Sequence, residues 1–186
     1  MARVYPRVIE KLTREPVEDY RIDFEDGYGH RPHAEEDAHA VSAGAELGRA
    51  ILSGSIPPSV GLRIKALSDP TAARAIRTLD LFLTSCIATS NKTLSSHFVV
   101  TLPKITSPKQ VTALAMIIDA FENTHALKPG AIGLEVMVET PQSLFNAAGE
   151  FVLPKLRAAA NGRLRSAHLG AYDFTAACDV SSSHQS

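Results

Sequence analysis

The sequence predicts an α/β fold of the (β/α)₈ TIM-barrel type, of which about five strand–helix units are present. Short apolar runs, partly β-branched, recur along the chain, and their starts are 39, 37, 35 and 34 residues apart. Segments with helical spacing of apolar residues lie between these runs. Alternating strands and crossover helices require a parallel sheet. Nearly every run also ends in a charged or small polar group, which is where barrels carry their chemistry.

The five predicted strands follow from these runs. They are RIDFE (21–25), VGLRIK (60–65), HFVVTLP (97–103), IGLEVMVE (132–139) and SAHLGAYD (166–173). A helix is predicted at 8–12, before the first strand, and one amphipathic helix is predicted in each gap. The best-defined helix begins after Ser107, which can cap it, with Pro108 at its first position, and it is expected to end near Gly130.

An open, doubly wound sheet is disfavoured by the glycine pattern. The pair Gly27 and Gly29 has no third glycine at the dinucleotide-binding spacing. A closed barrel needs roughly 250 residues, so we expect residues 1–186 to form a single, truncated barrel domain. Missing strands would expose two sheet edges that invite pairing with another chain. We therefore expect a homo-oligomer.

The composition excludes several classes of function. Hydrophobic residues make up 45% and charged residues 21% of the chain, enough for a core. The 19 Lys and Arg nearly balance the 20 Asp and Glu, so nucleic acid and membrane surfaces are not expected partners. With neither a membrane span nor a signal peptide, a cytoplasmic location is expected. The two cysteines, Cys86 and Cys178, are predicted to stay reduced.

Two carboxylates are candidate metal ligands. Strand alternation places Glu135 and Glu139 on the barrel interior, with Glu139 at the rim, because Pro141 stops the strand and begins a helix. Asp173 is expected to end the next strand in the same way. Adjacent strands lie ~4.8 Å apart, so the two acids would repel unless a cation such as Mg²⁺ lay between them. The alternative is that they pair with Arg or Lys at the rim or cap the following helices.

Other charged residues fall near the same rim. Arg63 is suited to bind a substrate carboxylate, or it pairs with Glu25. Asp23 and Glu25 point to one face, so at least one of them is expected to form an ion pair with Arg63 or Lys104. The histidines at 30 and 33 lie in a polar loop and are interpreted as surface residues.

The succession DFEDGYG, GLRIKAL, VVTLPKI, VMVETPQ and HLGAYDF resembles the strand-end motifs of the HpcH/HpaI aldolase and citrate lyase β-subunit family. The similarity covers about residues 20–180, and it is greatest with a citrate-lyase-like subgroup that carries RIDFEDGYG. It implies a metal-dependent barrel that makes or breaks a carbon–carbon bond next to a carboxylate. The implied substrates are oxo acids, hydroxy acids or their coenzyme A thioesters.

By the same resemblance, Glu139 in VETP and Asp173 in GAYD would be the ligands of Mg²⁺, or of Mn²⁺. Arg63 in GLRIK would bind a small carboxylic-acid substrate. Glu25 and Asp26, in the family's D-x-E-D element, and Lys104, in its L-P-K element, would be catalytic-site residues at the rim.

Two positions depart from the family pattern. Asp26 stands where the pyruvate aldolases carry a histidine base, which favours the lyase branch and leaves the general acid or base unassigned. Lys65 stands where many relatives carry asparagine. Two other interpretations stay open: a non-catalytic barrel fragment or assembly module, and a barrel enzyme acting on phosphoenolpyruvate, for which no glycine-rich phosphate cradle is present.

Overall fold

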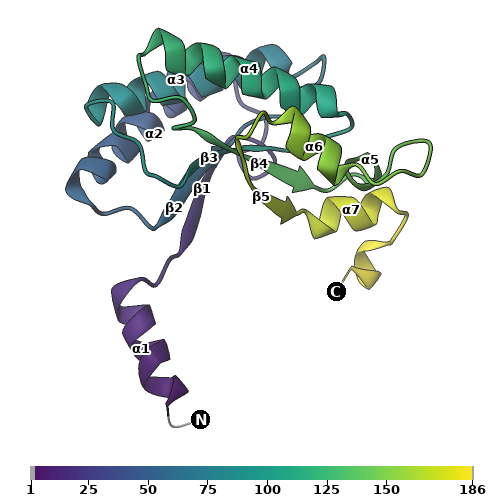
Figure 1. The fold of residues 1–186 in the computed structure, drawn as a ribbon, viewed down its shortest axis with the longest axis horizontal. Helices are drawn as coiled ribbons and strands as arrows, with labels where there is room; N and C mark the ends of the chain where they lie inside the picture. The colour runs from purple at the N-terminus through teal and green to yellow at the C-terminus, as the bar shows by residue number, and fades with distance from the viewer. Residues whose placement is uncertain (1–2, 186) are drawn as a thin grey trace.

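The computed structural model describes residues 3–185, which are organised around one parallel sheet of five strands (Figure 1). The strands are β1 (Asp19–Asp23), β2 (Ser59–Arg63), β3 (Phe98–Leu102), β4 (Gly133–Val138) and β5 (Leu164–Leu169). The outermost residues of the expected domain, 1–2 and 186, lie outside the described part.

The strand order supports a barrel-type sheet. The strands lie side by side in the order β1-β2-β3-β4-β5, and every neighbouring pair is parallel. In a doubly wound sheet the strand order reverses at a switch point, whereas here each new strand is added to the same edge. The predicted fold class, an incomplete (β/α)₈ barrel, is confirmed.

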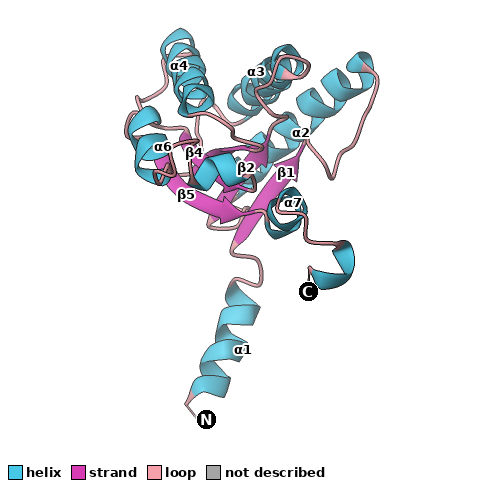
Figure 2. Cartoon of the chain, turned by 90° about the vertical axis from the view of Figure 1, so that its right-hand side faces the viewer, coloured by secondary structure: helices cyan, strands magenta, loops and turns pink. Residues whose placement is uncertain are grey.

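Helices connect the strands. They are α1 (Val4–Arg14), α2 (His33–Ser53), α3 (Ala72–Thr89), α4 (Pro108–Thr124), α5 (Pro141–Leu144), α6 (Leu153–Ala159), α7 (Ala171–Ala177) and a final 3₁₀ turn, η1 (Ser182–His184). Figure 2 shows α2, α3, α4 and α6 on one side of the sheet. Helix α4 begins with the predicted Ser107 cap, which forms a capping box with Gln110.

Two predicted element ends lie four or more residues from the observed ones. Helix α4 ends at Thr124 and not near Gly130, because Ala126 adopts a left-handed φ of 52° that stops the helix. The strand predicted to run to Asp173 ends at Leu169, and Asp173 lies in the first turn of α7.

The hydrophobic core lies between the sheet and its helices. Alternate strand residues, among them Val60, Leu62, Val100 and Leu134, are at most 1% exposed and contribute to this core. The opposite face of the sheet carries mostly polar side chains, among them Arg21, which makes it the candidate barrel interior. The alternation read from the sequence therefore assigned the two faces correctly.

Helix α1 extends away from the rest of the molecule (Figures 1 and 2), and none of its residues is buried. The helix predicted at 8–12 is confirmed. Its apolar side chains Tyr5, Val8 and Leu12 are 70%, 45% and 54% exposed. Within residues 3–185, no helix has the length and apolarity needed to cross a membrane.

Candidate active site at the carboxyl ends of the strands

The structure brings the six predicted site residues together at one end of the sheet. Glu25 and Asp26 follow β1, Arg63 ends β2, and Lys104 follows β3. Glu139 follows β4 directly, and Asp173 reaches the same place from the first turn of α7. The carboxyl ends of parallel strands lie at the same end of the sheet, so residues distant in sequence meet there.

Lys104 lies at the centre of this group. Its Nζ is 2.6 Å from Oδ2 of Asp173, 2.7 Å from Oδ2 of Asp26 and 3.3 Å from Oε1 of Glu25. Its backbone N–H donates to Oε1 of Glu139 at 2.6 Å. Burial lowers the pKa of Lys104, but the hydrogen bonds to Asp173 and Asp26 outweigh it and raise the pKa above its usual range. The ammonium therefore stays charged.

The backbone of Lys104 adopts a strained conformation. Its φ is 49°, in the left-handed region that a residue with a side chain seldom adopts. This conformation directs the N–H at Glu139 while the side chain reaches Asp173. Strain at a position that orients several polar groups is typical of functional sites.

The carboxylates of Glu139 and Asp173 lie beside each other. Glu139 is 2% exposed, and its burial, together with hydrogen bonding and repulsion from Asp173, raises its pKa, although the Lys104 N–H and ammonium oppose the rise. The pKa of Asp173 is lowered, chiefly by the hydrogen bond from Lys104. The pair thus concentrates negative charge at a partly dehydrated point.

Gly170 makes room for this pair. A Cβ at this position would lie 2.6 Å from Cβ of Glu139 and 2.7 Å from its Oε2. The Gly170 N–H also donates to the carbonyl of Val138 at 3.0 Å, which continues the pairing of β4 and β5 beyond the strand ends. Only a residue without a side chain lets β5 pass so near the Glu139 carboxylate.

The VETP segment fixes the position of Glu139. Thr140 caps the short helix α5, since its hydroxyl accepts from the Ser143 N–H, and Pro141 occupies the first turn. The same hydroxyl donates to the carbonyl of Ile105, in the loop after β3. Thr140, the residue after Glu139, is therefore hydrogen-bonded both to α5 and to the loop after β3.

Arg63 is held by two acids from β1 and the loop after it. Its Nε and Nη2 donate to Asp23 at 2.7 and 2.5 Å, and its Nη1 lies 3.4 Å from Oε2 of Glu25. Burial raises the pKa of Asp23, but the Arg63 guanidinium lowers it further, so the net shift is downward. The expectation that at least one of Asp23 and Glu25 pairs with Arg63 or Lys104 is confirmed, since Asp23 pairs with Arg63 and Glu25 lies 3.3 Å from Lys104.

Below the rim, the polar face borders an open cavity of about 300 Å³. It is lined by Arg21, Asp23, Arg63, Thr101, Glu135, Met137 and His168. Glu135 accepts hydrogen bonds from Thr101 at 2.7 Å and from Ser166 at 2.6 Å, and its Oε2 lies 3.2 Å from Arg21. Buried Glu135 is thus fully paired and braces three strands.

Lys65, Tyr28 and Tyr172 lie outside the acid cluster. Lys65 donates to the carbonyl of Phe24 at 2.7 Å and lies 2.9 Å from the buried Glu36 of α2. Tyr28 hydrogen-bonds to His39 at 2.8 Å, and Tyr172 is 74% exposed. The departure at Lys65 therefore changes the contact between loop and helix, not the acid cluster.

The donor set fits an open site for a hard divalent cation. Within residues 3–185, no group of three or more His, Cys, Asp or Glu side chains has a metal-binding arrangement. Glu139 and Asp173 offer two carboxylates, and Mg²⁺ typically takes one or two carboxylates and completes its shell with water and substrate.

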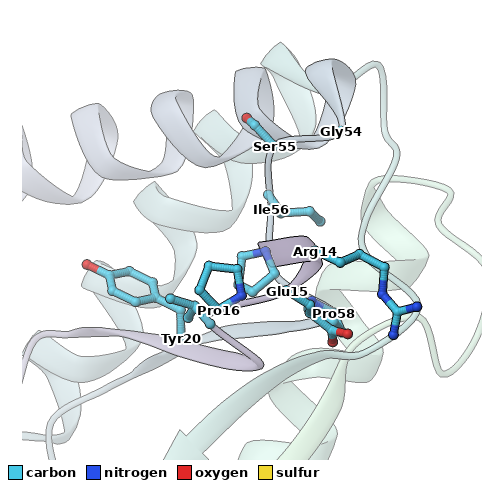
Figure 3. Close-up of a pocket in the computed structure, with 10 residues that line it drawn as sticks. Arg14, Glu15, Pro16, Tyr20, Gly54, Ser55, Ile56 and Pro58 are labelled. Atoms are coloured by element: carbon cyan, nitrogen blue, oxygen red, sulfur yellow. The ribbon is translucent and has the colours of Figure 1, made fainter. Parts of the chain in front are cut away.

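A larger hollow, of about 480 Å³, lies at the other end of the sheet (Figure 3). It is bordered by Pro16 and Tyr20 near the start of β1 and by Pro57 and Pro58 before β2. The strand-end acids are absent from its lining. Because parallel α/β folds carry their chemistry at the carboxyl ends of strands, we do not regard this hollow as the active site.

The sequence reasoning overlooked two residues near the site, Gly170 and His168. Alternation along β5 places both on the same face as Ser166, and Ser166 pairs with Glu135 in the sheet. The predicted strand ends at Asp173, four residues beyond the observed end of β5 at Leu169.

Comparisons with known proteins agree with the fold. The sequence model of a family described as a domain of unknown function (DUF6986) matches residues 1–186. A citrate lyase from Burkholderia xenovorans LB400 superposes with a TM-score of 0.61 at 21% identity, covering 94% of this chain and 47% of the lyase. No curated protein matches the sequence.

A malate synthase from Haloferax volcanii, solved as a lead(II) complex, gives a TM-score of 0.63 at 17% identity. It covers 87% of this chain and 43% of the synthase chain. The same synthase with magnesium and glyoxylate gives a TM-score of 0.60, also at 17% identity, covering 87% of this chain and 44% of that chain. The chain therefore spans less than half the length of these structures, and at this identity the likeness shows the fold.

Proposed function

This chain belongs to the DUF6986 family, and for it we propose the function of a divalent-metal-dependent carbon–carbon lyase or aldolase. Its substrate class would be a small oxo or hydroxy carboxylic acid, or the coenzyme A thioester of one. We also propose, on the strand-end motifs, that the chain is related to the citrate-lyase-like subgroup of HpcH/HpaI aldolases.

One observation carries this proposal: the carboxylates of Glu139 and Asp173 converge at the rim beside the Arg63–Asp23 pair. A fixed pair of hard oxygen ligands next to a guanidinium suits a substrate that presents a carboxylate and a neighbouring oxygen. The magnesium and glyoxylate named for the Haloferax volcanii malate synthase add support, since that protein shares the fold.

The residues at the rim would have different roles in the reaction. Glu139 and Asp173 would hold Mg²⁺, or Mn²⁺, which would supply neutralisation of the negative charge that develops on an enolate. Arg63, oriented by Asp23, would bind the acid end of the substrate and fix its position. Lys104 would balance the charge of the acid cluster and, through its N–H, orient Glu139.

The test is calorimetric titration of the chain with Mg²⁺, alone and with pyruvate or oxaloacetate. We expect Mg²⁺ binding in the wild type and at least a tenfold loss of affinity in both Glu139→Gln and Asp173→Asn. Glu150→Gln, which removes an exposed carboxylate outside the cluster, should bind as the wild type does. Absence of Mg²⁺ binding by the wild type would contradict the proposal.

Thermal unfolding separates loss of a ligand from loss of the fold. Because burial and Asp173 raise the pKa of Glu139, its ionised form is disfavoured in the folded chain. The amide of Glu139→Gln keeps an acceptor for the Lys104 N–H, so the metal-free variant should melt no lower than the wild type.

A second candidate role is assembly, with the chain pairing with a further copy of itself. The exposed apolar side chains of α1 favour it, as do the outer edges of β1 and β5, which are unpaired within residues 3–185. Light scattering after size exclusion should give more than the monomer mass of 20.0 kDa. We expect Leu12→Glu to reduce that mass, and a wild-type monomer would contradict this role.

A further inference from the structure

The cavity beneath the rim contains a histidine, and the proposed reaction still needs a residue that acts as general acid and base. A lyase of the proposed kind needs a proton acceptor and donor, and the residues at the rim leave that role unassigned. Of the side chains that line the cavity, His168 is the one imidazole, a group that can both accept and donate a proton.

The two carboxylates that line the cavity already accept hydrogen bonds from neighbouring side chains. Asp23 accepts two hydrogen bonds from Arg63, and Glu135 accepts from Arg21, Thr101 and Ser166. Both carboxylates are held ionised by these donors, as their lowered pKa values indicate. Neither can readily take up and return a proton in a catalytic cycle.

His168 has the right position on the sheet. It pairs in register with Met137, whose Sδ lies 3.6 Å from Nη1 of Arg63. It also lies on the same strand face as Gly170, two residues further along, where the backbone passes against the carboxylate of Glu139. With a strand rise of ~3.3 Å per residue, His168 lies below the rim on β5, among the residues that line the cavity.

The ring is also accessible. His168 is exposed on the cavity face of β5, whereas its neighbour Met137 is only 8% exposed. The charged groups that face the cavity are Arg21 and Asp23 from β1, Arg63 from β2 and Glu135 from β4. They form opposite-charge pairs with one another, Arg21 with Glu135 and Arg63 with Asp23.

We propose that His168 is the general acid and base of this site, an inference that rests on the proposed lyase function. In the cleavage direction its imidazole takes the proton of a hydroxyl on the carbon β to the activated carbonyl. That oxygen forms the C=O bond of one product, and the electrons of the broken carbon–carbon bond form the enolate of the other. The imidazolium then returns the proton to the enolate carbon, which restores the neutral ring.

The first experiment measures exchange of the methyl protons of pyruvate with D₂O by NMR, in the presence of Mg²⁺, which isolates the enolate step. We expect His168→Gln to slow this exchange at least a hundredfold, with Mg²⁺ and oxalate affinities within twofold of the wild type. Added imidazole should restore part of the exchange in His168→Ala. His97→Gln, an exposed histidine before β3, should exchange as the wild type does.

The second experiment is independent of turnover. Oxalate, which resembles the enolate of pyruvate, is titrated with Mg²⁺ into the chain while the ring C–H signals of the histidines are followed. We expect the His168 signals to shift and those of His97 to stay in place.

The outcomes separate the two proposals. The role of His168 would be overturned if His168→Gln exchanged the pyruvate protons at the wild-type rate. It would also be overturned if the His168 ring signals did not shift when oxalate bound. Either result would leave the lyase proposal intact. A wild type that binds neither Mg²⁺ nor oxalate would contradict the lyase function itself.

Discussion

The ammonium of Lys104 lies 2.6 Å from the carboxylate of Asp173, in the middle of four acidic side chains that converge at the strand ends. A positive charge is thus built into the place where two neighbouring carboxylates would otherwise repel each other. The relationship bears directly on metal binding, because a divalent ion held by Asp173 must share or displace this contact.

Removing the ammonium should therefore favour the metal. We expect Lys104→Met to bind Mg²⁺ about tenfold more tightly, which corresponds to ~1.4 kcal/mol, in calorimetric titration at neutral pH. Lys109→Met, on the exposed side of α4, is the matched control and should bind as the wild type does. Weaker Mg²⁺ binding in Lys104→Met would show that the lysine supports the metal site and does not compete with it.

Gly170 should be intolerant of a side chain. In Gly170→Ala the new Cβ would meet Glu139 at 2.6 Å, so we expect Mg²⁺ affinity to fall at least tenfold. Overpacking should also lower the free energy of unfolding by about 1–3 kcal/mol, measured by urea denaturation. Leu169→Ala, a change at the adjacent residue, which is 63% exposed, should alter neither quantity appreciably. Unchanged metal binding in Gly170→Ala would mean that Glu139 is not a ligand or that it can move freely.

Arg163 should be important for stability and not for chemistry. Only 6% of its side chain is exposed, and Nη2 lies 2.6 Å from Oε2 of the buried Glu122, while Nη1 donates to the Ile132 carbonyl at 2.9 Å. Removal of one partner leaves a buried charge unpaired, so Arg163→Met should cost about 3–5 kcal/mol of unfolding free energy. Arg157→Met, on the exposed side of α6, should cost much less.

The cost of Arg163→Met should also depend on pH. Burial raises the pKa of Glu122, but Arg163 and the backbone N–H groups of Ile132 and Gly130 lower it below its ordinary value of 4.5. A lowered folded-state pKa stabilises the fold above that ordinary value, and the contribution is lost as pH falls. The difference between wild type and variant should thus shrink in acid, and a difference that grows would contradict the pairing.

The two cysteines should differ sharply in reactivity. Cys86 is fully buried, and burial raises the pKa of its thiol to about 11, whereas Cys178 is exposed. Because the thiolate is the reactive form, we expect a colorimetric thiol reagent at pH 8 to modify one thiol quickly in the folded chain and the second only after unfolding. Rapid modification of two thiols without denaturant would show that the core around α3 opens readily.

The sequence by itself determined the architecture and which polar residues lie at the strand ends. Apolar runs with period two, helices of period 3.6 and polar groups at the strand ends indicated a parallel barrel-type sheet, and alternation alone placed Glu135 and Glu139 on the polar face. These are local properties, since each depends on residues that are neighbours in the chain.

The contacts between strand ends were decided only by the tertiary structure. The left-handed backbone of Lys104, the closeness of Gly170 to Glu139, the position of Asp173 on a helix and the presence of His168 in the cavity all depend on how separate βα units are brought side by side. Sequence periodicity specifies the face on which a side chain lies. It does not specify which distant group the side chain meets, because that depends on register, on loop conformation and on the length at which each strand ends.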